Sequence, residues 1–363
     1  MPLAPVDATG IQLHYEDSGA PPGCTVYTTV LFIHGIYFNG GIFKPMFPYA
    51  AQNNLRFVSL DARDNGGSTL FSEEELKQLR SPRREDQEAF VKQRVFELAA
   101  FLHWYIEQEK IPPLQEQSSE RIGGISLACW SAGNSLGVSF LAHADVIPQT
   151  TRTFLERYLR SYIIYDPPMS PFGIPMPPSD ELYSPARDPM LPLDRMASVI
   201  LPYLIGHYNN DGPLTYQAFR ATNLAEFPSR HDFCRSLDWK PVDGNDVNPA
   251  DFESITELQA LTRSAIPSLA LNPEIFATFT DRLVDDGEHA TEYFPKVTLE
   301  CVVGSRTISA TMYAVYALKG MVLQREAAGR KGRKIAFHVF DGANHAWHWL
   351  RPEPTAAFFG MIV

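Results

Sequence analysis

The sequence has little cysteine, a deficit of positive charge and no long hydrophobic run. Only four cysteines occur among 363 residues, and no two of them form a Cys-x-x-Cys pair. This scatter does not match the spacing of zinc ligands, so we expect no metal site. It favours reduced thiols, as in a cytoplasmic protein. No phosphate-binding loop or nucleotide fingerprint occurs either, and we expect no cofactor.

The charge balance and the hydropathy pattern limit the possible partners. Lys and Arg number 31 against 42 Asp and Glu, which gives a net charge of -11. This balance disfavours nucleic acid and anionic membranes as partners. No apolar run reaches the ~18 residues that a membrane span needs, and the start "MPLAPVDATG" lacks the basic and apolar regions of a signal peptide. The oligomeric state stays open.

What the sequence does contain is an alternation of buried-strand and helix patterns. The run at 10–19 predicts an edge strand, and 84–108 has the apolar spacing of a helix. Strands buried on both faces are predicted at 25–35 and 55–61, and further strands at 124–130, 160–166, 296–304 and 334–342. Strands alternating with helices indicate an α/β fold with a doubly wound, mostly parallel sheet.

The middle of the chain interrupts this alternation. Residues 167–294 show no clear buried strand; they begin rich in proline and continue with helical patterns. Insertions of this length in a compact fold are usually functional lids. We therefore expect a core formed by 1–166 and 295–363, with a mainly helical cap at 167–294. The alternative is a simple surface excursion.

The segment "CWSAG" places Ser131 between a predicted strand and a predicted helix. In the G-x-S-x-G turn, a nucleophilic serine is exposed at the carboxyl end of a sheet. Here Cys129 replaces the first glycine, while Ala132 and Gly133 keep the turn small. Ser131 is the candidate nucleophile; the alternative is a serine that only caps the helix.

Two further segments supply the other groups that acyl transfer needs. The backbone N–H groups of Ile36, after "FIHG", and of Ala132 are candidates for the oxyanion hole. We expect His34 to brace its loop rather than act as a base. His345, in "DGANH" after the last predicted strand, is the candidate general base. His348 is the alternative.

The motifs "LFIHG", "FVSLDARDNGGS", "CWSAG" and "DGANH", in this order, resemble the α/β-hydrolase fold superfamily. The resemblance covers about residues 8–168 and 294–360. It implies a serine hydrolase with a Ser-His-Asp triad, and we interpret "DARDNGGS" as architectural. The run "IIYDPPMS" at 163–170 is similar to a branch of fungal hydrolases found with toxin and other secondary-metabolite pathways.

The position of the triad carboxylate differs from the pattern of most members of the superfamily, in which an aspartate follows the next-to-last strand. That place reads Gly304-Ser305-Arg306-Thr307. Asp166, at the end of the strand predicted at 160–166, is the best candidate, as in some members of the family. Asp341 is the rival, and Asp166 could also merely end its strand. A carboxylate is required because the imidazole needs a fixed tautomer.

These residues favour an enzyme that cleaves an ester, lactone or thioester of an apolar, medium-sized small molecule. A serine at the position where dehalogenases and epoxide hydrolases carry aspartate argues against both. We expect Tyr37 and Trp130 to contact the substrate. Two alternatives remain: an acyltransferase or lyase/cyclase on the same triad, and a non-catalytic small-molecule binder on the same fold.

Overall fold

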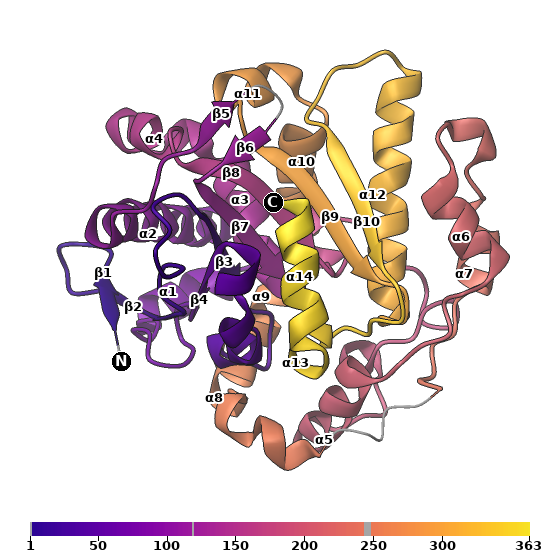
Figure 1. The fold of residues 1–363 in the computed structure, drawn as a ribbon. Helices are drawn as coiled ribbons and strands as arrows, with labels where there is room; N and C mark the ends of the chain where they lie inside the picture. Colours follow the sequence, from indigo (N-terminus) through magenta and orange to yellow (C-terminus); the bar gives the residue numbers. More distant parts are fainter. Residues whose placement is uncertain (1, 118–119, 243–247) are drawn as a thin grey trace.

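The computed structural model describes residues 2–117, 120–242 and 248–363, and its centre is one eight-stranded sheet (Figure 1). The strands β1 and β2 at one edge are antiparallel, and the other neighbouring pairs are parallel apart from β2 with β4. In spatial order the strands are β1 (Leu3–Pro5), β2 (Gln12–Asp17), β4 (Leu55–Leu60), β3 (Thr28–Ile33), β7 (Ile125–Trp130), β8 (Leu159–Tyr165), β9 (Thr298–Gly304) and β10 (Ile335–Phe340). The predicted α/β class and doubly wound sheet are confirmed.

The central strands are buried on both faces, which is why they appear as continuous apolar runs. All residues of β3, β4, β7 and β8 are buried. Successive side chains of a strand point to opposite faces, so Leu31 and Ile33 of β3 join one apolar core and Val30 and Phe32 the other. The sheet therefore separates two cores.

Helices cover both faces of the sheet. One core is completed by residues of α1 (Glu73–Leu79), α2 (Arg84–Glu109), α3 (Asn134–Ala142), α4 (Gln149–Leu155), α10 (Pro273–Val284) and α12 (Ser309–Ala327). The other core is completed by residues of the 3-10 helix η1 (Gly40–Tyr49), α13 (Trp347–Leu350) and α14 (Pro352–Ile362). A small hairpin, β5 (Gln115–Gln117) and β6 (Glu120–Ile122), lies outside the main sheet.

The segment between β8 and β9 adds no strand to the main sheet within its described residues. Its helices are α5 (Leu193–Ile205), α6 (Pro213–Arg220), α7 (Arg230–Arg235), α8 (Leu258–Ala260), α9 (Ile266–Leu269), α10 and α11 (Gly287–Glu292), with a π-helical turn, η9 (Leu261–Ala265). The last part of the segment returns to the core, because α10 packs against α3. In Figure 1, α5 and α8 lie beyond the end of the sheet, and α6 and α7 lie outside α12.

All four cysteines are free thiols, and only Cys24 is exposed. Along the described chain, no helix combines the length and the apolar character that a bilayer crossing requires.

Candidate active site

Ser131 occupies the sharp turn between β7 and the 3-10 helix η3 (Ser131–Gly133). Its φ is 53°, in the left-handed region that side-chain-bearing residues seldom occupy. The turn depends on small neighbours. A Cβ at Gly35 would lie 2.7 Å from Ser131 Cβ, and one at Gly133 would lie 2.5 Å from the His34 carbonyl oxygen. Close packing of two glycine-containing loops therefore holds Ser131 in its strained conformation.

Cys129 stands where the turn motif usually has its first glycine. Its side chain is buried, and burial raises the pKa of its thiol well above the ordinary value, which makes it a packing residue rather than a nucleophile. A Cβ at Gly137 would lie 2.7 Å from Cys129 Sγ and 2.5 Å from the Tyr162 ring. The cysteine side chain needs room that a glycine at position 129 would not need. Gly137, on the facing helix α3, leaves that room because it has no side chain.

His345 lies in the loop after β10, and its Nε2 is 3.0 Å from Ser131 Oγ. Its Nδ1 is hydrogen-bonded to Asp166 Oδ2. Behind it, Trp130 Nε1 donates to the His345 carbonyl oxygen at 2.9 Å, and the two ring centroids are 4.9 Å apart. The imidazole is therefore fixed from behind, with one nitrogen toward a hydroxyl and the other toward a carboxylate.

Asp166 follows the last residue of β8 and is fully buried. Besides His345, it accepts hydrogen bonds from the Gly304 N–H at 3.0 Å and from Thr307 Oγ1 at 2.5 Å. Thr307 Oγ1 also lies 3.4 Å from His345 Nδ1. Thr307 occupies the place of the usual acid, and here it donates to the acid instead. The sequence shows that an aspartate is missing at this place, but no local pattern indicates that the Thr307 hydroxyl contacts the acid.

The rival residues have other partners. Asp341 accepts a hydrogen bond from Ser305 Oγ at 3.1 Å. His348 Nδ1 is 2.7 Å from the Tyr165 hydroxyl oxygen, and the His348 ring packs against Phe43. Burial, together with the nearby His345, holds the pKa of His348 well below its ordinary value. The geometry thus brings Ser131 together with His345 rather than with His348.

The two candidate oxyanion donors lie beside the serine. Ala132 is the second residue of η3, where helix N–H groups have no partner within the helix. A Cβ at Gly35 would lie 3.5 Å from Ala132 N, so glycine keeps the space beside that N–H open. Ile36 follows directly on the facing loop. The loop that carries Ile36 therefore packs directly against the turn that carries Ser131 and Ala132.

His34 braces this loop, as the sequence analysis expected. Its Nδ1 donates to the Gly35 carbonyl oxygen at 2.7 Å, and its Nε2 accepts from the Ala62 N–H at 3.0 Å. Burial lowers the pKa of His34, so the ring is neutral and keeps one donor and one acceptor. The loop that carries Ile36 is thereby tied to the loop after β4.

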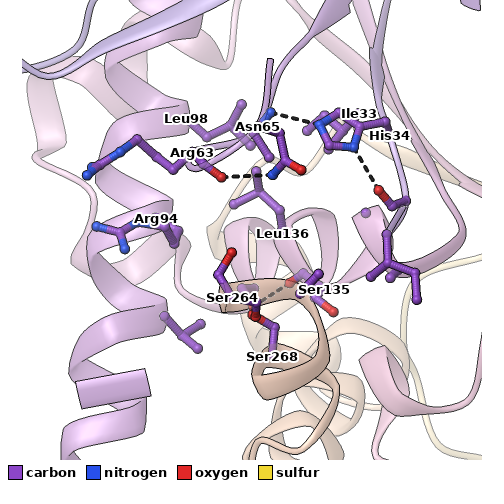
Figure 2. A pocket seen from close by; sticks show the side chains of 18 of the residues that line it. Ile33, His34, Arg63, Asn65, Arg94, Leu98, Ser135, Leu136, Ser264 and Ser268 are labelled. Atoms are coloured by element: carbon purple, nitrogen blue, oxygen red, sulfur yellow. Dashed lines mark hydrogen bonds between the residues drawn. The ribbon is translucent and has the colours of Figure 1, made fainter. Parts of the chain in front are cut away.

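A cavity of about 170 Å³ opens beside the candidate oxyanion donors. It is bordered by Gly35, Ile36 and Ala132, by α2 and α3, and by the segment from Ser264 to Phe276. Figure 2 shows Leu136 of α3 between the helix that carries Arg94 and the loop that carries His34, with the Ser264–Ser268 turn beside it. The cavity is thus formed between the core and the segment inserted between β8 and β9.

A family model described as the alpha/beta hydrolase family matches residues 30–358. The chain belongs to the alpha/beta hydrolase family. Among solved structures, Cfl2 from Burkholderia cenocepacia is 13% identical with a TM-score of 0.53, covering 98% of this chain and 93% of that chain. A mutant of epoxide hydrolase from Solanum tuberosum is 15% identical with a TM-score of 0.52, covering 99% and 97%. At such identities the likeness shows the fold alone. No curated protein sequence matches.

In this hydrolase-family chain, the two expected substrate contacts are buried in the core beneath the site. Trp130 is 1% exposed and packs behind His345. Tyr37 is 6% exposed, and its carbonyl oxygen accepts a hydrogen bond from the Glu257 N–H at 2.8 Å. These positions give both residues a supporting role and do not favour direct contact with a substrate.

The "DARDNGGS" turn is architectural and also joins the core to the inserted segment. Asp61 accepts from His14 Nδ1 at 2.6 Å and from the Gly40 and Gly67 N–H groups at 2.7 and 3.1 Å. Asp64 accepts from Ser264 Oγ at 2.8 Å and forms an ion pair with the neighbouring Arg263 of η9. One turn therefore stabilises the loops on both sides of the cavity.

Another part of the inserted segment contacts the loop that carries Thr307 and the loop that carries the base. Asn210 Nδ2 donates to the Thr307 carbonyl oxygen at 2.6 Å, and Asn344 Nδ2 donates to the Ile205 carbonyl oxygen at 2.5 Å. Asn344 directly precedes His345. The inserted segment thus touches both the cavity and the backbone beside the candidate triad.

Proposed function

We propose that this protein is a serine hydrolase that cleaves an ester, thioester or lactone of an apolar, medium-sized acyl compound. The observation that carries the proposal is the hydrogen-bonded series from Ser131 Oγ through His345 to Asp166. The strained backbone of Ser131 supports it as well, since such strain clusters at functional sites.

The roles follow from the chemistry of each group. Ser131 Oγ attacks the acyl carbonyl carbon while His345 Nε2 takes the hydroxyl proton. The carbonyl oxygen becomes an oxyanion, which the N–H groups of Ile36 and Ala132 stabilise. Loss of one such donor costs about 10²–10³ in rate in a characterised serine protease. His345 then gives its proton to the leaving group, the carbon–leaving-group bond breaks, and an acyl-enzyme remains.

Water completes the cycle. His345 takes a proton from water, the resulting hydroxide attacks the acyl-enzyme, and Ser131 leaves with the proton returned by His345. Asp166 stays ionised throughout; it fixes the proton on Nδ1 and stabilises the imidazolium. We further propose that the inserted residues 167–294 act as a cap, since their part from Ser264 to Phe276 borders the cavity beside the nucleophile.

The test is labelling with a fluorophosphonate probe, followed by location of the modified peptide by mass spectrometry. We expect an adduct on Ser131 in the native protein and none after heat denaturation. Ser131→Ala should abolish both labelling and cleavage of p-nitrophenyl esters. Ser198→Ala on the exposed side of α5, whose hydroxyl donates to the Arg195 carbonyl oxygen, is the matched control and should keep both.

Two outcomes would contradict the proposal. Saturable binding of apolar esters with neither labelling nor turnover would indicate a binder on this fold. Labelling of Ser131 with product formed only when an alcohol or amine acceptor is supplied would indicate an acyltransferase.

A further inference from the structure

The cavity beside the candidate oxyanion donors has a defined place relative to the reacting carbon. The tetrahedral carbon carries four groups: Ser131 Oγ, the oxyanion, the leaving group and the acyl chain. The oxyanion faces the N–H groups of Ile36 and Ala132. The leaving group must lie near His345 Nε2, because that nitrogen protonates it. The acyl chain takes the one remaining direction.

The cavity lies on the oxyanion side and not on the histidine side. Gly35, Ile36 and Ala132 border it, whereas Ser131, His345 and Asp166 are not among the described residues that line it. Ser131 Oγ lies directly next to the lining, because a Cβ at Gly35 would be 3.2 Å from it. Resting on the proposed function, we infer that this cavity binds the acyl part of the substrate, and that the alcohol or thiol part leaves from the opposite side of Ser131.

The lining defines the chemical class of the acyl group. Its apolar side chains come from α2, α3 and the inserted segment: Phe90, Leu98, Leu136, Leu271 and Phe276. Several hydroxyl groups are already used within the protein, since Ser139 Oγ donates to the Ser135 carbonyl oxygen at 2.6 Å and Ser268 Oγ to the Ser264 carbonyl oxygen at 2.8 Å. The cavity therefore favours an apolar chain over a hydrogen-bonding one.

The charges at the cavity wall are paired with one another. Arg63 and Arg94 contact Glu97 at 2.7 and 2.8 Å, and Arg94 also contacts Glu75 at 2.7 Å. Two positive and two negative groups leave no net charge for an ionic ligand group to neutralise, although Arg94 Nη1 is buried with no hydrogen-bond partner among the described residues. Burying an additional carboxylate beside Glu97 is unfavourable without a further positive charge, so the balance of charges favours a neutral acyl group.

The size of the cavity limits the length of the acyl chain that it can bind. An apolar cavity of about 150 Å³ in another protein binds benzene, which has six carbon atoms, so a cavity of about 170 Å³ suits an acyl group of about six carbons. The acyl group is therefore of medium length, centred on a hexanoyl chain, and we expect a lauroyl chain to be accepted less well.

The test compares two series of esters on the intact protein. With p-nitrophenol as the constant leaving group, kcat/KM should rise from acetate to hexanoate and fall for laurate. With hexanoate as the constant acyl group, ethyl to octyl esters should differ by only about threefold. The p-nitrophenyl monoester of adipic acid should be at least about tenfold worse than the hexanoate, as expected for an unpaired charge in an apolar site.

Substitutions in the cavity wall test whether the preference for acyl-chain length depends on this cavity. Leu136→Phe should lower the ratio of hexanoate to acetate activity by about tenfold or more, because one methylene in an apolar pocket is worth about 10–200-fold. Ser268→Phe narrows the cavity from the other wall and should act in the same direction, which keeps the test valid if one variant does not fold. Ala270→Phe, at the exposed end of α9, is the matched control and should leave the ratio unchanged.

The outcomes separate the two proposals. Ester cleavage that depends on the alcohol length rather than the acyl length would overturn the acyl assignment and leave the serine hydrolase intact. A preference for the adipic monoester would overturn the neutral class. Absence of both probe labelling and turnover would instead refute the proposed function itself.

Discussion

Asp166→Asn is the substitution that tests the candidate triad most directly. The carboxylate accepts three hydrogen bonds: from His345 Nδ1–H, from Thr307 Oγ1 and from the Gly304 N–H. An asparagine can keep the bond from the Gly304 N–H through an amide oxygen in the place of Oδ1, but its NH₂ group then takes the place of Oδ2 and faces both Thr307 Oγ1 and His345 Nδ1. Because Nδ1 must now accept, the imidazole proton moves to Nε2, where it faces Ser131 Oγ. The base can then no longer take the serine proton.

The expected loss is large. A wrong tautomer in a serine protease triad lowers kcat by about 10⁴, which corresponds to about 5.5 kcal/mol of transition-state stabilisation at 1.36 kcal/mol per factor of ten. The assay is kcat and KM for p-nitrophenyl hexanoate, together with the rate of fluorophosphonate labelling. Both kcat and the labelling rate should fall, while KM should change little, because Asp166 is buried and does not reach the substrate.

Asp341→Asn is the control for this experiment. Its carboxylate accepts from Ser305 Oγ, a bond that an amide oxygen also accepts, so activity should stay within about threefold of the unmodified protein. If Asp341→Asn lost the activity and Asp166→Asn kept more than a tenth of it, the assignment of the acid would be wrong.

Three further predictions follow from the same contacts. Thr307→Val removes the hydroxyl that donates to Asp166 and should lower kcat by about 10- to 100-fold, the worth of a hydrogen bond to a charged group, whereas Thr307→Ser should keep most of it; steady-state kinetics checks both. Cys129→Gly should lower the free energy of unfolding by about 2 kcal/mol, through a lost buried side chain and a more flexible backbone, as measured by urea denaturation. The hydrogen bond with Asp61 raises the pKa of His14; burial opposes ionisation of Asp61, yet the bond keeps the pKa of Asp61 below its ordinary value. Removing this pair with His14→Gln should therefore destabilise the protein most between about pH 4 and 6.5, where both partners would be charged even when unfolded. The loss should shrink as the pH rises through the raised pKa of His14, and unfolding curves at pH 5.5 and 9 test this.

Much of the core could be predicted because its strands are long and buried on both sides. The runs around β3, β4, β7 and β8 contain few polar residues, and a helical period covers α2 almost to its observed ends. The strand β1 and the hairpin of β5 and β6 escaped notice, because three-residue strands with polar or proline residues show no period.

The candidate site was predictable where one short motif carries each group and not where distant segments meet. Ser131, His345 and Asp166 each follow a recognisable strand, so their positions in the sequence were enough to make them candidates. The role of Thr307 depends on a hydroxyl 141 residues from Asp166 in the chain, which no local pattern reveals. The packing of Trp130 behind His345 was not foreseen, because a large aromatic residue beside a nucleophile looks the same in sequence whether it faces a ligand or supports a histidine.

The contacts of Asn210 and Asn344 with the loops around the triad have a consequence for how such enzymes diversify. In many proteins an inserted segment can be exchanged as a unit to obtain a new specificity. Here the exchange would also remove the donor to the Thr307 carbonyl oxygen and the acceptor at Ile205. A chimera that carried a relative's insertion would then need compensating changes in the loops after β9 and β10. New substrate preferences in this lineage are therefore easier to reach by point substitutions around the cavity than by recombination.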